Sequence, residues 1–183
     1  METCIALFRG INVGGKNVLP MKDLRSALED IGARNVQTYI QSGNAVFRTD
    51  ETDVQLLADR IRTLIGERHG FEPHVLVLTL QEMEDSVGSN PFPEAESEPK
   101  TLHFLFLDCA PEDPDPDGLE SIKGELERFY LKGRTFYLHA PEGLGRSRLA
   151  ARAERLLGVP ATARNWRTVR KVLTLAQECD RDT

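Results

Sequence analysis

The fold of this chain is decided first by residues 3–8, Thr3-Cys4-Ile5-Ala6-Leu7-Phe8, a short apolar run that ends at Arg9 and Gly10. An apolar run of this length predicts a strand that is buried on both faces. Pro20 suits the first turn of a helix, and apolar residues then recur at helical spacing until Gly32 ends the pattern. The chain is therefore predicted to begin as strand, loop and helix.

The next fifty or so residues complete one structural unit. Two strands are predicted over residues 36–40 and 45–48, because the polar stretch 41–44 between them has the turn chemistry of a hairpin. Thr52 and Gln55 have the spacing of a capping box and introduce a second helix, and residues 75–78 form a fourth strand. The order is βαββαβ, as in a ferredoxin-like lobe.

The second half of the chain repeats this order, with an extra helix after each copy. The predicted strands cover residues 102–107, 129–131, 135–139 and 161–163, and the predicted helices cover 119–128 and the segment that Ser147 opens. Residues 88–100 are rich in proline and glutamate, a composition typical of a linker. We therefore predict an α+β fold of two ferredoxin-like βαββαβ lobes in tandem, namely 1–88, a linker 89–100, and 101–183 with an additional C-terminal helix.

Charge is uneven along the 183 residues, whose formal net charge is −6. Residues 81–133 contain 4 basic and 14 acidic side chains, whereas residues 134–183 contain 10 basic and 5 acidic ones. The overall acidity argues against a protein that coats DNA. The basic final third leaves two interpretations open, an anion-binding face and an ordinary solvated helix surface.

Composition also limits the location and the cofactors. No apolar run approaches the roughly 18–20 residues that cross a bilayer, and the start lacks the pattern of a secretory signal, so we expect a cytoplasmic protein without a membrane partner. We expect Cys4 and Cys109 to pack in the interior and Cys179 to be exposed. The cysteines form no Cys-x-x-Cys pair and the four histidines are scattered, so no metal site is expected and the cofactor is unknown.

The loop over residues 9–17 fits the pattern Gly-x-x-x-x-Gly-Lys from Gly10 to Lys16. We do not expect a Walker-type ATP site, because Asn17 replaces the hydroxyl residue that holds magnesium and the helix near Pro20 begins too late. A simpler hypothesis is that backbone N–H groups, Arg9 and Lys16 together hold a phosphate or carboxylate. The alternative is that the glycines only provide turn geometry.

Three further polar segments are candidates for ligand binding. Residues 41–44 form a polar hairpin tip, residues 143–147 precede a helix whose N-terminus favours anions, and residues 164–171 mix cations with Trp166. The structural alternatives are a plain turn, an N-cap at Ser147 and a core position for Trp166. The candidate ligand-binding residues are Arg9, Asn12, Gly14, Gly15, Lys16, Gln41, Ser42, Asn44, Arg146, Ser147, Arg164, Asn165 and Arg167.

Several of these motifs resemble the signature of the bacterial domain-of-unknown-function 1697 family. The resemblance rests on residues 7–17, Pro20-Met21 and residues 38–44, and it continues in Asn90-Pro91-Phe92, Pro99-Lys100 and residues 164–169. It covers nearly the whole chain and implies an α+β fold that contains ferredoxin-like lobes. It implies no activity, because the family has no established one, and it transfers no catalytic or binding residues.

The leading functional hypothesis is a module that binds a small anionic or nucleotide-containing ligand, with single-stranded nucleic acid as one form of it. A second hypothesis is an enzyme that uses the same cleft, in which Lys16 or Arg9 stabilises developing negative charge. A third is a non-enzymatic protein–protein interaction module that uses an open sheet edge. The sequence identifies no nucleophile, general base or oligomeric state.

Overall fold

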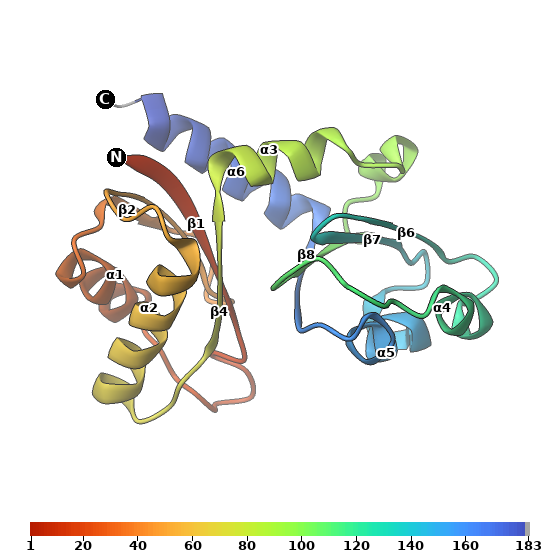
Figure 1. Cartoon of the computed structure of the whole chain (residues 1–183), viewed down its shortest axis with the longest axis horizontal. Coiled ribbons are helices and arrows are strands. Elements are labelled where there is room, and N and C mark those ends of the chain that lie inside the picture. Colours follow the sequence, from red (N-terminus) through yellow and green to blue (C-terminus); the bar gives the residue numbers. More distant parts are fainter. Residues whose placement is uncertain (182–183) are drawn as a thin grey trace. The chain divides into compact units, whose positions relative to one another are not determined.

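The computed structural model describes residues 1–181, which form two compact units. Unit 1 contains Met1–Asp85 together with the residues from Lys171 onward, and unit 2 contains Ser86–Arg170. Each unit holds one four-stranded antiparallel sheet with helices on it (Figure 1). The predicted α+β class and the presence of two tandem lobes are confirmed.

Unit 1 is built around β1 (Glu2–Arg9), which lies in the interior of a sheet of order β2-β3-β1-β4. The other strands are β2 (Arg34–Thr38), β3 (Asn44–Thr49) and β4 (His74–Thr79). Helices α1 (Met21–Asp30) and α2 (Val54–His69) cover one face of the sheet (Figure 1). The core between sheet and helices includes Cys4, Ala6, Phe8, Leu24, Leu28, Leu57 and Ile61.

Unit 2 has the same element order and the same strand order. Its sheet runs β6-β7-β5-β8, and its strands are β5 (Leu102–Leu107), β6 (Arg128–Lys132), β7 (Thr135–His139) and β8 (Ala161–Asn165). Helices α4 (Pro116–Ile122) and α5 (Arg148–Leu157) pack on one face (Figure 1). Leu105, Leu107, Phe136, Leu138, Leu149 and Leu157 belong to the core between them.

Two further helices, α3 (Leu80–Gly88) and α6 (Trp166–Arg181), follow the two βαββαβ segments, as predicted. A capping box starts α3. The backbone N–H of Thr79 donates to Glu82 Oε2 at 2.9 Å, and the N–H of Glu82 donates to Thr79 Oγ1 at 3.1 Å. This reciprocal pair satisfies two N–H groups that a helix start leaves without a partner.

Two details of the predicted helices are wrong. The cap of α2 is Asp53, whose carboxylate accepts from the N–H groups of Gln55 and Leu56 at 3.0 Å, rather than Thr52. The helix predicted over residues 119–128 is α4, which begins at Pro116 behind the capping residue Asp115 and ends at Ile122. The acidic, proline-rich segment therefore starts the helix earlier than its apolar pattern indicated, because both residue types favour helix starts.

Residues 89–100 belong to unit 2, although the sequence predicted a linker there. They include the short 3-10 helix η1 (Pro93–Ser97), and they bury the side chains of Phe92 and Ala95. Arg128 of β6 lies over the Phe92 ring, 4.8 Å from its centroid, and forms an ion pair with Glu94.

The residues from Lys171 onward belong to unit 1, where Thr3 Oγ1 donates to Asp180 Oδ1 of α6 at 2.9 Å.

Two of the three cysteines differ from the expectation. Cys4 is buried as predicted, and its burial raises the pKa of the thiol to about 12. Cys109 is exposed and Cys179 is buried, which is the reverse of what was expected. Cys179 occupies the inward side of α6, a position that the charged residues around it in the sequence concealed.

None of the described helices, over residues 1–181, is both long and apolar enough to cross a membrane.

The arginine that contacts Phe92 and Glu94, Arg128, is itself bound to a neutral imidazole. His139 Nδ1 lies 3.1 Å from Arg128 Nη2 and has to accept this hydrogen bond, since a guanidinium only donates. Burial and the nearby Arg128 lower the pKa of His139, while Glu94 and Glu98 oppose this shift. The unfolded chain therefore takes up a proton at a higher pH than the folded protein.

We predict that the free energy of unfolding decreases as the pH falls below about 6.5, the ordinary pKa of histidine, and that His139 contributes to this slope. His139→Gln keeps an acceptor for Arg128 but cannot take up a proton. Urea denaturation at several pH values should therefore show a smaller slope for the variant than for the parent protein. Identical slopes would contradict the assigned role of His139.

Candidate functional site

In unit 1, Asn12 joins two segments, residues 9–19 and residues 39–44, which contain the predicted ligand loops 9–17 and 41–44. Its Nδ2 donates to the carbonyl of Leu19 at 2.9 Å and to the carbonyl of Gln41 at 2.8 Å. Its Oδ1 accepts from the N–H of Leu19 at 2.8 Å. Both amide protons of Asn12 are thus used within the protein, so this predicted binding residue holds the loops together. We call the two segments the loop pair.

The tip of the first loop is a tight two-residue turn. Val13 and Lys16 form a β-bridge, in which the N–H of Lys16 donates to the Val13 carbonyl at 3.0 Å. Gly14 and Gly15 between them have φ values of +58° and +76°, the conformation that such turns require. Because α1 begins only at Met21, its N-terminus is not part of this loop, as expected for a chain without a Walker-type site.

The second loop is seated tightly against the first strand. The N–H of Phe8 donates to the Gly43 carbonyl at 2.9 Å, and a Cβ atom at Gly43 would lie 2.6 Å from Phe8 Cβ and from Ile11 Cδ1. Asn44 is fully buried, and its Nδ2 donates to the Tyr39 carbonyl at 2.9 Å. Asn44 is therefore a structural residue of the turn.

One residue of the second loop has a strained backbone. Ile40 has a φ of +50°, a value that a β-branched side chain rarely adopts, and its side chain is 49% exposed. The chain therefore holds an apolar residue at the surface at a cost in conformational energy. Such strain is frequent at functional sites.

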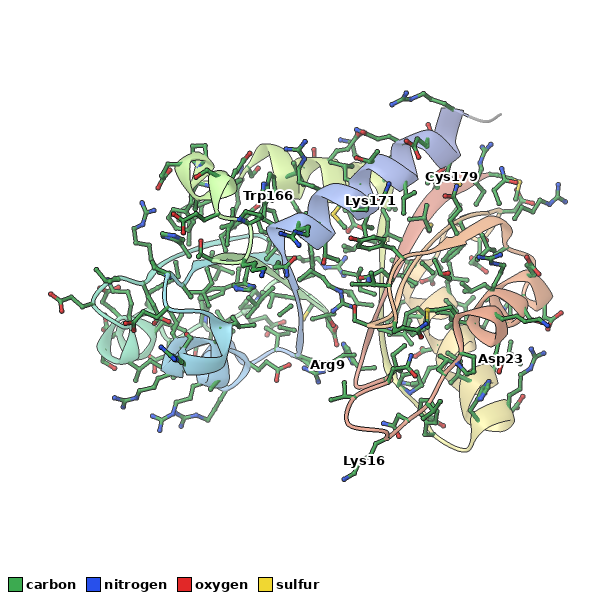
Figure 2. All side chains as sticks on the ribbon, turned by 180° about the vertical axis from the view of Figure 1, so that it is seen from behind. Arg9, Lys16, Asp23, Trp166, Lys171 and Cys179 are labelled. Carbon is green, nitrogen blue, oxygen red and sulfur yellow. The ribbon has the colours of Figure 1, made fainter. Side chains whose placement is uncertain are left out.

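The groups that the loop pair presents to solvent are polar or basic. Arg9, Lys16, Gln41 and Ser42 are exposed, and the Lys16 side chain projects from the tip of its loop (Figure 2). Neither segment contains a carboxylate, a histidine or a cysteine. The exposed side chains of the loop pair can therefore form hydrogen bonds and attract negatively charged groups.

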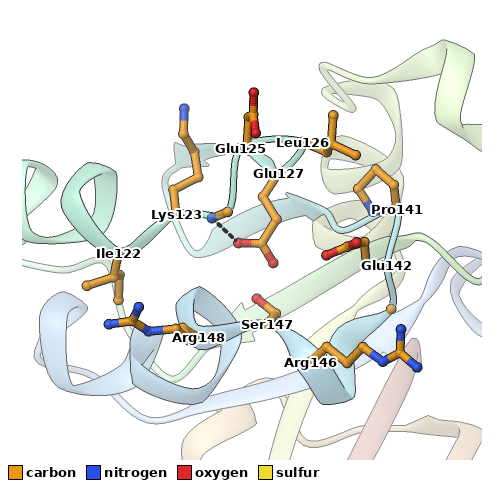
Figure 3. A pocket seen from close by; sticks show the side chains of 12 residues that line it. Ile122, Lys123, Glu125, Leu126, Glu127, Pro141, Glu142, Arg146, Ser147 and Arg148 are labelled. Carbon is orange, nitrogen blue, oxygen red and sulfur yellow. Dashed lines mark hydrogen bonds between the residues drawn. The ribbon is translucent and has the colours of Figure 1, made fainter.

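In unit 2, Arg146 and Ser147 line a hollow of about 280 Å³ (Figure 3). Ser147 is the N-cap of α5, since its Oγ accepts from the N–H of Ala150 at 2.9 Å. Glu127 on the opposite wall accepts from the N–H of Gly124 at 2.8 Å. Equal numbers of cations and carboxylates line the hollow, so it does not select an anion by charge: Lys123, Arg146 and Arg148 against Glu125, Glu127 and Glu142.

The last predicted group, also in unit 2, has mainly structural contacts. The Oδ1 of Asn165 accepts from the N–H of Thr168 at 3.0 Å and caps α6. Trp166 is buried, 5.4 Å from Phe104 between ring centroids, as its helical position indicated. Burial lowers the pKa of Arg164 to about 10, whereas Arg167 is exposed. Of the three candidate residues here only Arg167 is exposed, and Arg170 and Lys171 of the same segment are exposed as well.

Two residues that are not among the candidate ligand-binding residues also shape the loop pair. Asn17 has a φ of +50°, and its Nδ2 donates to the Gly10 carbonyl at 2.8 Å, which closes the base of the first turn. Gly43 fills a space that no other residue fits. The signal was present in both cases, because asparagine and glycine are the residues that tolerate a positive φ.

We predict that Gly43→Ala lowers the free energy of unfolding by about 2–4 kcal/mol, because the new Cβ combines steric overlap with an unfavourable φ. Gly14→Ala is the matched control: its φ is also positive, but no atom lies within 4 Å of the added Cβ. We expect the control to cost only about 1 kcal/mol. Urea denaturation measures both, and equal losses would show that the contact with Phe8 and Ile11 is unimportant.

Comparison with known proteins identifies a family and a similar solved structure, and neither description states an activity. A search of curated proteins found no match to the chain. Among solved structures, the conserved bacterial protein SP0830 from Streptococcus pneumoniae is similar, with a TM-score of 0.69 and 27% sequence identity over 96% of this chain and 98% of that chain. The sequence model of the family described as "Protein of unknown function (DUF1697)" matches residues 1–137. The chain therefore belongs to the DUF1697 family.

Proposed function

We propose that the loop pair of unit 1 binds a small anionic ligand, such as a phosphate-bearing or nucleotide-containing molecule. The observation that carries this proposal is the clamp made by Asn12. Of the three hydrogen bonds that this side chain forms, two bind Leu19 within the first loop and one reaches the Gln41 carbonyl of the second, so the side chain shapes one exposed, acid-free loop and ties it to the other. Such a rigid arrangement reduces the entropy that binding would otherwise cost.

The charge of the loop pair suits an anion. Arg9 and Lys16 are its charged residues, and both are basic. A guanidinium or ammonium that donates to a phosphate or carboxylate makes a stronger hydrogen bond than a neutral donor does. Gln41 and Ser42, on the second loop, add polar groups that suit a sugar or a base.

The loop pair also offers apolar contact. Val13 is 67% exposed and Ile40 is 49% exposed, one on each loop. Ligand sites commonly combine apolar contact with a few oriented polar groups. A nucleotide, with a flat apolar base and a charged phosphate, matches this combination better than inorganic phosphate does.

Binding is favoured over catalysis because the loop pair offers no histidine or carboxylate that could act as a general base for the hydroxyl groups of Ser42 and Tyr39. It contains no histidine, carboxylate or cysteine, so the predicted enzyme would need such a group from elsewhere in the chain. No specific observation favours the interaction module over the ligand site.

The ligand site would belong to a ferredoxin-like lobe. Each unit has the element order βαββαβ and an antiparallel sheet in which the first and third strands are central. This arrangement supports two copies of that lobe. In unit 1 the loop pair comprises the connection after β1 and the hairpin between β2 and β3.

Titration calorimetry with ATP, a ribonucleoside monophosphate and inorganic phosphate tests this proposal. We predict that Lys16→Gln weakens the binding of the tightest ligand about tenfold, the effect expected for one hydrogen bond to a charged group. Arg25→Gln, an exposed arginine of α1, removes the same charge elsewhere in unit 1 and should leave the affinity unchanged.

Two outcomes would overturn the proposal. One is that none of the three compounds binds at millimolar concentration. The other is that Lys16→Gln and Arg25→Gln weaken binding equally, which would indicate a general charge effect.

A further inference from the structure

Three arginines lie in a line along the exposed side of α5. Arg148, Arg152 and Arg155 are spaced i, i+4 and i+7, and all three are exposed. Residues at these spacings share one side of a helix. We call them the arginine stripe. A different side of the helix is buried in the core of unit 2 and carries Leu149, Ala153 and Leu157.

No ion pair within the described part of the chain neutralises the stripe, although Arg148 lines the same hollow as Glu125, Glu127 and Glu142. None of its three guanidinium groups forms an ion pair with a residue among 1–181. The segment from residue 143 to residue 170 contains seven arginines and a single carboxylate, that of Glu154. Glu154 Oε1 accepts from the N–H of Ala161 at 2.7 Å, so this carboxylate is used in holding β8 to α5.

The stripe is unfavourable for the helix itself. Like charges three and four residues apart repel each other on a helix surface. Arg148 is also the first residue of α5, where the helix dipole favours an acid, yet the first turn contains none. The three arginines therefore destabilise α5. A bound external anion would reduce both the repulsion between them and the unfavourable interaction of Arg148 with the helix dipole.

The spacing of the stripe suits an anion that repeats. At about 1.5 Å of rise per residue, Arg148 and Arg155 are separated by roughly 10 Å along the helix. One phosphate group cannot reach both ends, whereas successive phosphates of a nucleic-acid strand can. Arginine is also the side chain that contacts phosphate oxygens in pairs.

The observations favour a nucleic acid over a membrane surface. Helices that lie in a membrane interface insert an exposed apolar face. The apolar side of α5 is buried, and no residue of α5 is among the exposed large hydrophobic side chains of the described chain. The hollow beside Arg148 is lined by three glutamates that repel phosphate (Figure 3). A nucleic-acid strand is therefore expected to lie along α5 and not in the hollow.

We propose that the arginine stripe of α5 binds the phosphate backbone of a nucleic-acid strand without reading its bases. The proposal rests on residues of unit 2 and does not depend on the loop pair. Loss of one function would leave the other intact.

Fluorescence anisotropy with a labelled single-stranded RNA, measured between about 50 and 200 mM salt, tests the proposal. We predict that replacing Arg148, Arg152 and Arg155 together by Gln weakens binding at least about tenfold at the lower salt concentration. The slope of log K against log salt should fall by about 2, since each phosphate contact on a single strand contributes about 0.7. Glutamine favours helices, and circular dichroism verifies that α5 is retained.

The matched control is the triple variant Arg25→Gln, Arg34→Gln and Arg181→Gln, which removes three exposed arginines of unit 1. It changes the net charge by the same amount and should leave the slope unchanged. If the stripe variant loses helix, the single variant Arg152→Gln replaces it, with an expected fall in slope of about 0.7.

Three results would overturn the proposal. The first is that the parent protein does not bind the RNA at the lower salt concentration. The second is that both triple variants lose affinity and slope equally, which would reflect bulk charge. The third is binding to phosphatidylserine-containing vesicles without binding to RNA, which would assign the stripe to a membrane surface.

Discussion

The burial of β1 on both faces is the constraint on which unit 1 depends. Every side chain from Thr3 to Phe8 is buried, so both faces of this interior strand need a cover. Helices α1 and α2 cover the face that carries Cys4, Ala6 and Phe8. On the other face Thr3 binds Asp180 of α6, which explains why the C-terminal half of that helix belongs to unit 1 although it follows unit 2 in the sequence.

The same strand determines where the loop pair is placed. Its last buried residue, Phe8, donates to the carbonyl of Gly43, and the first loop leaves the sheet immediately afterwards. A polar segment that leaves a fully buried strand has to satisfy its own backbone, because no neighbouring strand does so. Asparagine side chains satisfy part of the loop backbone here, since Asn12, Asn17 and Asn44 each donate to backbone carbonyls of the loops. The surface that remains is rigid, exposed and free of acidic groups.

The helices determine which charged residues of the chain share a surface. The net charge of −6 and the acidic middle segment describe the protein as a whole, but they do not describe its local surfaces. In α5 the apolar residues turn inward and three arginines remain outside, and the helix contains a single carboxylate, that of Glu154. Local arrangement therefore decides which anions the protein can attract, since charges beyond about 10 Å are largely screened at physiological salt.

The sequence by itself determined the order of elements and most of their bounds, because hydrophobic period, glycine and capping residues act locally. β7, α5 and the capping box of α3 are examples. It also identified Ser147 as a residue that could cap a helix. Only the tertiary structure decided which candidates face solvent. Asn12 and Asn44 were predicted to bind ligands but bind backbone atoms, Cys179 is buried, and residues 89–100 are packed rather than a linker. The physical reason is that a polar side chain can satisfy the backbone or a ligand with the same atoms, and the choice depends on partners that are distant in sequence.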